Sequence, residues 1–94
     1  MSKIIIPPTV GRVVLFYPAA DRWAGYTFAV GQAHAAQIAL AHNDHYVNLG
    51  VLDQQGRHLA LQEVPLLQAD DLIPDADHCR WMPYQVGQAR KEAA

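Results

Sequence analysis

The stretch HAAQIALAHNDHYVNLGVLDQQGRHLALQEVPL, residues 34–66, decides the fold, because it divides into three segments joined by two tight turns. The alanines of its first segment would suit a helix. However, apolar side chains on successive segments face one another across the turns only if the stretch forms a β-meander. We therefore predict three strands, at 34–42, 45–52 and 58–66.

The first turn of this meander is predicted at Asn43-Asp44, because both residue types tolerate the positive φ of a two-residue hairpin turn. Such a turn brings His42 beside His45. Further along the hairpin it sets three pairs of apolar side chains on one face, as expected for a strand that covers a core. The predicted pairs are Leu40 with Val47, Ile38 with Leu49, and Ala36 with Val51.

The second turn is predicted at residues 53–57, where Gly56 can adopt the left-handed conformation of a three-residue loop with a bulge. The inward face of the middle strand then has apolar partners on both sides. The predicted pairs across this turn are Val51 with Leu59, and Leu49 with Leu61. A slip of one residue in either hairpin would turn these side chains to the opposite face, so the pattern specifies the register.

Two further strands flank the meander. Residues 10–17 are rich in β-branched and aromatic side chains and end before a proline, and residues 79–82 form a short closing segment. Together with the long connection at 18–32, these segments have the layout of an all-β protein, a small five-stranded SH3-like barrel. An OB-fold is the alternative, although no helix is evident between the strands.

The length of 94 residues suits one domain with one core. We expect an extended arm at residues 1–9, a single β-barrel domain at 10–85, and a tail at 86–94 that is either a frayed helix or disordered. The net charge of −2 argues against nucleic acid as a partner, since a backbone binder needs a basic face. No apolar run reaches the roughly 20 residues of a membrane span or has the make-up of a signal peptide, so we expect a cytoplasmic protein without membrane contact.

The sequence contains few residues in arrangements that suit catalysis or metal binding. His42 and His45, side by side in the predicted hairpin, could share an ion, but zinc usually has four ligands, so this is a weak alternative to no metal. Cys79 and the neighbouring His78 would point to opposite faces of a strand and cannot form a nucleophile–base pair by themselves. We therefore expect no enzyme activity and no cofactor.

Four aromatic residues provide the candidate partner-binding surface. Trp23 and Tyr26 lie in the long connection, and Trp81 and Tyr84 lie in the closing segment. In SH3-like barrels these two regions meet at one side, where aromatic side chains can bind extended peptides. The surface would serve a protein partner or self-association. The other interpretation is that these rings pack in the core or at its rim.

Several stretches of the chain resemble a group of small uncharacterised proteins of tailed bacteriophages and their prophages. The shared pattern reads VGRVV, then VNL-V-D--G, then VPL, and finally WMPYQ-GQA, and it covers roughly residues 8–89. The segment at 81–85 is its most specific part. The resemblance implies a phage or prophage origin and a place in the bacterial host cytoplasm or in the virion, and it brings no catalytic motif.

Taken with the fold, this resemblance leads us to expect a non-enzymatic module for protein interaction or assembly. One version is an accessory component of the virion, in which the arm and the tail hold protomers together. The alternative is an intracellular phage effector that binds a host protein or a small ligand during infection.

Overall fold

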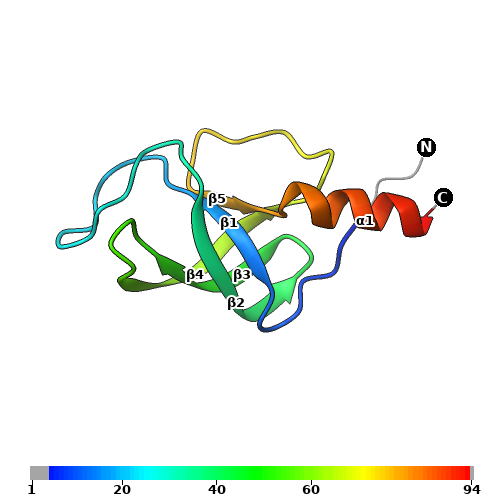
Figure 1. The fold of residues 1–94 in the computed structure, drawn as a ribbon, viewed down its shortest axis with the longest axis horizontal. Helices are drawn as coiled ribbons and strands as arrows, with labels where there is room; N and C mark the ends of the chain where they lie inside the picture. Colours follow the sequence, from blue (N-terminus) through cyan, green and yellow to red (C-terminus); the bar gives the residue numbers. More distant parts are fainter. Residues whose placement is uncertain (1–4, 94) are drawn as a thin grey trace.

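Within residues 5–93, which the computed structural model describes, five strands close into a barrel in the order β1-β2-β3-β4-β5 (Figure 1). The elements are β1 (Val13–Tyr17), β2 (His34–Asn43), β3 (Tyr46–Leu52), β4 (His58–Leu67), β5 (His78–Arg80) and the helix α1 (Pro83–Ala93). Neighbouring strands are antiparallel except for β4 and β5, which are parallel. The predicted all-β, SH3-like barrel is confirmed.

The β2–β3 hairpin follows the predicted register near its middle and departs from it towards its turn. The confirmed pairs are Ala36 with Val51 and Ile38 with Leu49. Beyond Ile38 the register shifts, so Leu40 lies opposite Asn48 and its side chain is 47% exposed. The predicted Leu40–Val47 pair is wrong, because Ala41 takes the place opposite Val47.

The turn of this hairpin is one residue later than predicted. Asn43 still belongs to β2 and pairs with Tyr46, so the turn residues are Asp44 and His45. The side-chain oxygen of Asn43 accepts the backbone N–H of His45 at 2.8 Å, a local bond for which asparagine is suited. The predicted Asn43-Asp44 turn is therefore wrong, and His42 does not lie opposite His45.

The β3–β4 hairpin has the predicted register. The confirmed pairs are Val51 with Leu59 and Leu49 with Leu61. Gly56 adopts a φ of +80°, and its N–H donates to the carbonyl of Asp53 at 3.0 Å. Nearer the end of β4, Glu63 has a φ of +53° at a bulge, where its N–H donates to the side chain of Asn48 at 2.9 Å.

The turn at Gly56 can be tested with valine. Gly56→Val should lower the free energy of unfolding by about 1–2 kcal/mol or more, because a β-branched residue resists positive φ. No atom lies within 4 Å of the added Cβ, so the loss would report backbone strain. The matched control is Gly50→Val in β3, where the φ is ordinary and the space is also open. Equal urea-unfolding midpoints for the two variants would contradict this turn.

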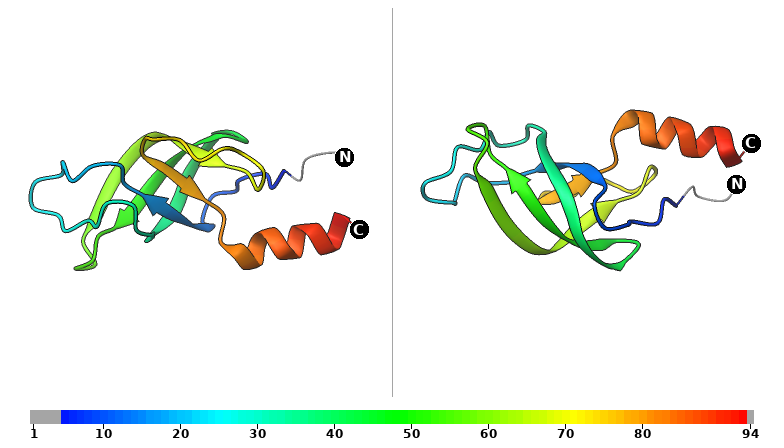
Figure 2. Two further views of the ribbon diagram at one scale, coloured as in Figure 1. Left: turned by 90° about the horizontal axis from the view of Figure 1, so that it is seen from above. Right: turned by 60° about the horizontal axis from the view of Figure 1, so that its bottom comes forward.

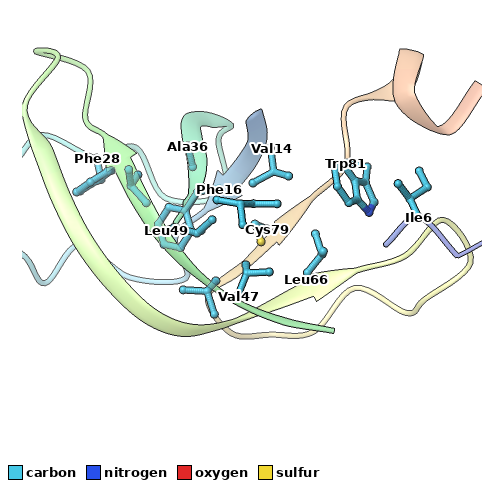
Figure 3. Close-up of a cluster of buried hydrophobic side chains, with 13 residues drawn as sticks. Ile6, Val14, Phe16, Phe28, Ala36, Val47, Leu49, Leu66, Cys79 and Trp81 are labelled. Carbon is cyan, nitrogen blue, oxygen red and sulfur yellow. The ribbon is translucent and has the colours of Figure 1, made fainter. Parts of the chain in front are cut away.

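The core lies inside the barrel, along its long axis (Figure 3). In β1, Val14 and Phe16 point inward and have no exposed surface, whereas Val13 is 37% exposed, as strand alternation requires. The strand begins at Val13, later than the predicted residue 10, because residues 10 and 11 form a turn. The closing strand likewise ends at Arg80, earlier than the predicted residue 82.

The described part of the arm, residues 5–9, is packed against the barrel. Ile6 is 7% exposed and belongs to the core cluster, at the same end as Trp81 (Figure 3). The side-chain amide of Gln68 accepts the N–H of Ile6 at 2.9 Å and donates to its carbonyl at 3.1 Å. Residues 1–4 of the predicted arm lie outside the described residues.

The helix α1 begins at Pro83, whose fixed φ suits the first turn of a helix. The side chain of Gln85 accepts the N–H of Met82 at 2.7 Å, as in a capping box, and donates to the carbonyl of Val13 at 3.2 Å. Residues 86–93 continue this helix, and Ala94 of the predicted tail lies outside the described residues. The loop between β1 and β2, residues 18–33, is called the long loop. Figure 2 shows α1 and the arm at one end of the barrel and the long loop at the other.

Candidate functional site

The structure does not bring the predicted aromatic residues to one side of the barrel. Trp23 packs edge-on against Phe28, at the end that carries the long loop, whereas Trp81 lies at the opposite end (Figure 3). The reason is that β1 and β5 are antiparallel neighbours, so the loop after β1 and the segment after β5 leave the sheet at opposite ends. The interpretation of one shared aromatic surface is therefore wrong.

Trp23 and Tyr26 are engaged in packing within the long loop. The ring of Trp23 contacts Phe16 and Phe28, with centroid distances of 6.0 and 5.2 Å. The hydroxyl of Tyr26 donates to the carbonyl of His58 at 2.8 Å, and its ring stacks on Phe28. These rings fasten the loop to the core, which matches the interpretation of rim packing.

Asp53 anchors the long loop to the β3–β4 turn. Its side chain is buried and accepts backbone N–H groups from Thr27 at 2.8 Å, Gln55 at 2.9 Å and Arg57 at 2.8 Å. Burial by itself would raise the pKa of Asp53. The three amide hydrogen bonds and the charge of Arg57 outweigh that effect and hold the pKa below its ordinary value.

This carboxylate should make the stability of the fold depend on pH in acid. Because the folded pKa of Asp53 is lowered, its contribution is present above the unfolded pKa of about 3.9 and is lost as the pH falls through the folded pKa. Urea unfolding from pH 7 to pH 2 should show wild type and Asp53→Asn converging as the pH falls. A constant difference between the two proteins would contradict this prediction.

The two histidines of the weak metal hypothesis have separate partners. His42 bonds to the side-chain oxygen of Asn48 at 2.9 Å, and His45 lies 3.6 Å from the carboxylate of Asp71. Within residues 5–93, no group of three or more His, Cys, Asp or Glu side chains could hold a metal ion. The structure therefore does not form the His42–His45 pair on which a shared ion depends.

Cys79 is buried in β5, where its thiol lies 3.5 Å from the carbonyl of Pro65. Burial raises the pKa of this thiol to about 12. We predict that iodoacetamide at pH 8 does not label the folded protein and labels it after denaturation, as followed by mass spectrometry. The chain has a single cysteine, so the assay needs no further substitution. Labelling at equal rates in both states would contradict the buried position.

An apolar hollow of about 350 Å³ opens between the loop of residues 68–77 and α1. Its apolar lining comes from Leu67, Ala69, Ile73, Trp81, Pro83 and Val86. Trp81 is the largest side chain of this lining and is only 4% exposed, and we call this feature the Trp81 hollow. A hollow of this size and apolar lining lies within the range of sites that bind ligands or side chains.

The walls of the Trp81 hollow are held by contacts of their own. Gln68 and Asp71 close the loop through two hydrogen bonds, of 2.8 and 3.0 Å. Arg80 is fixed by a 3.0 Å bond to the ring of His78. An ion pair between Asp70 and Arg90, with an N···O distance of 3.6 Å, connects the loop to α1. These contacts hold the walls of the hollow in place within the folded protein.

The acidic loop of residues 68–77 exposes two large apolar side chains, of which Ile73 lines this hollow. Leu72 is 92% exposed and Ile73 is 63% exposed. Leu72 lines a second hollow, which includes Tyr46 and Pro65. Tyr84 is 69% exposed on α1 and does not line the Trp81 hollow. Of the four predicted residues, only Trp81 therefore belongs to this site.

The sequence contained a signal for Leu72 and Ile73 that periodicity does not capture. These two residues stand between an acidic pair and a proline, in a segment that belongs to no strand or helix. An apolar pair in such a loop either folds back onto the core or stays at the surface. The structure shows the second case, since both side chains remain exposed.

Comparisons with known proteins give no match for this chain among family models, curated proteins or solved structures. Within residues 5–93, the helix is too short and too polar to span a membrane. The geometry of the Trp81 hollow is therefore the main guide to the function of this chain.

Proposed function

We propose that this chain is a non-enzymatic protein-interaction module, and that the Trp81 hollow with the adjacent Leu72 and Ile73 is its binding surface. The observation that carries this proposal is an exposed isoleucine, Ile73, in the lining of an apolar hollow, with the exposed Leu72 next to it in the chain. Contiguous apolar surface of this kind is typical of protein interaction sites. In this proposal the binding surface lies at the helix end of the barrel and not on the long loop.

The chemistry of the hollow supports binding of apolar side chains. Its polar lining residues are Gln68, Asp71 and Arg80, and each has a structural contact within the protein. A partner would therefore gain mainly from burying the apolar surface of Ile73 and of the helix. This favours a protein or peptide as the occupant over a highly charged small molecule.

The resemblance to proteins of tailed bacteriophages supports a further part of the proposal, a phage or prophage origin. On that basis we propose a role in assembly, as an accessory component of the virion. The alternative is an intracellular effector that binds a host protein. Mass spectrometry of purified particles distinguishes them, because a virion component is present in particles and an effector is absent from them.

The binding surface can be tested with a displayed library of random peptides. We expect the immobilised protein to select peptides with large apolar side chains, bound with micromolar dissociation constants. Ile73→Glu should weaken their binding at least tenfold, because a charge would stand at the rim of the apolar hollow. Val30→Glu in the long loop, where Val30 is 52% exposed, is the matched control and should bind like wild type.

An NMR titration with a selected peptide locates the site independently. The protein has two tryptophans, so two indole N–H signals are expected, and Trp81→Phe or Trp23→Phe assigns them. The signal of Trp81 should shift on binding and that of Trp23 should not. Selected peptides that bind Ile73→Glu as well as wild type, or that shift only Trp23, would contradict this binding surface.

A further inference from the structure

The helix end of the barrel carries both a protruding apolar side chain and an apolar hollow. Leu72, with 92% of its surface exposed, protrudes from the same loop that forms one wall of the Trp81 hollow. Two such features on one surface allow contact between two copies of it. A two-fold axis can bring the protruding side chain of each copy to the hollow of the other.

We infer that the occupant of the Trp81 hollow is a second copy of this chain. In this arrangement, Leu72 of each copy enters the hollow of the other, so both exposed leucines become buried at once. The inference deepens the proposed function and rests on it, because it names the partner that the same surface binds.

The charges around the hollow are also complementary between two copies. The loop of residues 68–77 contains four aspartates and no lysine or arginine, whereas the last turn of α1 contains Arg90 and Lys91. Asp70 and Arg90 form a loose pair of 3.6 Å, and their side chains are 53% and 54% exposed. When two-fold symmetry sets one rim against the other, Asp70 of each copy faces Arg90 of the other and the acidic loops face the basic helix ends.

Sedimentation equilibrium and native mass spectrometry of the full chain test this inference. We expect a dimer for wild type at micromolar concentrations. Leu72→Asp should raise the dissociation constant at least tenfold, because it removes the buried side chain and adds a charge in its place. Val30→Asp is the matched control, since Val30 is also an exposed apolar side chain but lies in the long loop. Circular dichroism should show all these proteins folded.

Charge reversal separates contacts between copies from contacts within one copy. Asp70→Lys and Arg90→Glu should each weaken the dimer severalfold, because each substitution acts twice in a symmetric interface. An equimolar mixture of the two variants should form a heterodimer, since the introduced lysine of one copy then meets the introduced glutamate of the other. Within each copy the like charges still repel, so only a contact between copies can restore association. The pair is exposed, so neither variant should lose much stability.

Two outcomes would overturn the inference. One is a wild-type protein that stays monomeric up to millimolar concentration. The other is a dimer that is insensitive to Leu72→Asp and whose charge variants do not associate on mixing. If either outcome is found, the peptide selection still tests the proposed function on its own. Peptides that lose affinity on Ile73→Glu would preserve the binding surface with a different partner, whereas the absence of selected peptides would remove both.

Discussion

Replacing Leu49 with alanine is expected to lower the free energy of unfolding by about 2–5 kcal/mol, whereas the same replacement at Leu40 should cost less than about 1 kcal/mol. Leu49 is 2% exposed at the centre of β3, and Leu40 is 47% exposed in β2. The first substitution leaves a cavity inside a closed barrel. The second removes a side chain that is already half in water, so little packing is lost.

Urea unfolding of the two variants against wild type measures this difference. The pair is well matched, because both are leucines in strands of the same hairpin and the same atoms are removed. A loss below about 1 kcal/mol at Leu49 would place its side chain at the surface. A loss at Leu40 as large as at Leu49 would restore the register that the sequence predicts and contradict the register shift beyond Ile38.

This contrast also shows why the fold was more predictable than its details. Near the middle of the meander, apolar residues alternate on three strands and their partners are mutually consistent, as for Leu49 between Ile38 and Leu61. Towards the β2–β3 turn, bulges interrupt the alternation of inward and outward side chains. The residue at the β4 bulge, Glu63, is neither glycine nor asparagine, so nothing in the sequence marks its positive φ.

The candidate site was less predictable than the fold, because it depends on how strands are ordered in space. Trp81 could be singled out as a large aromatic residue in the closing segment, but its separation from Trp23 follows from the antiparallel pairing of β1 and β5. The burial of Ile6 depends on a contact with Gln68, which is 62 positions away in sequence. Local patterns carry no information on such contacts.

Gln68→Ala is expected to lower the free energy of unfolding by about 2–4 kcal/mol, because three buried or partly buried backbone groups lose their partners. The side-chain amide of Gln68 bonds to the N–H and the carbonyl of Ile6 and donates to the carbonyl of Asp44 at 2.9 Å. Gln68 is 3% exposed, so water replaces these bonds only after the arm moves away. The arm, the β2–β3 turn and the wall of the Trp81 hollow therefore depend on one side chain.

Urea unfolding measures this loss, and Gln88→Ala is the matched control. The side chain of Gln88 is exposed on α1 and bonds to Glu92 at 3.3 Å, so its removal should change the stability by less than about 0.5 kcal/mol. Hydrogen exchange of the Ile6 amide gives a second measurement, because that amide should be protected in wild type and exchange readily in Gln68→Ala. If the double variant loses as much free energy of unfolding as Ile6→Ala and Gln68→Ala lose together, the two residues do not act together. A double variant that is less destabilised than that sum would show that Gln68 stabilises the fold by holding Ile6 in the core.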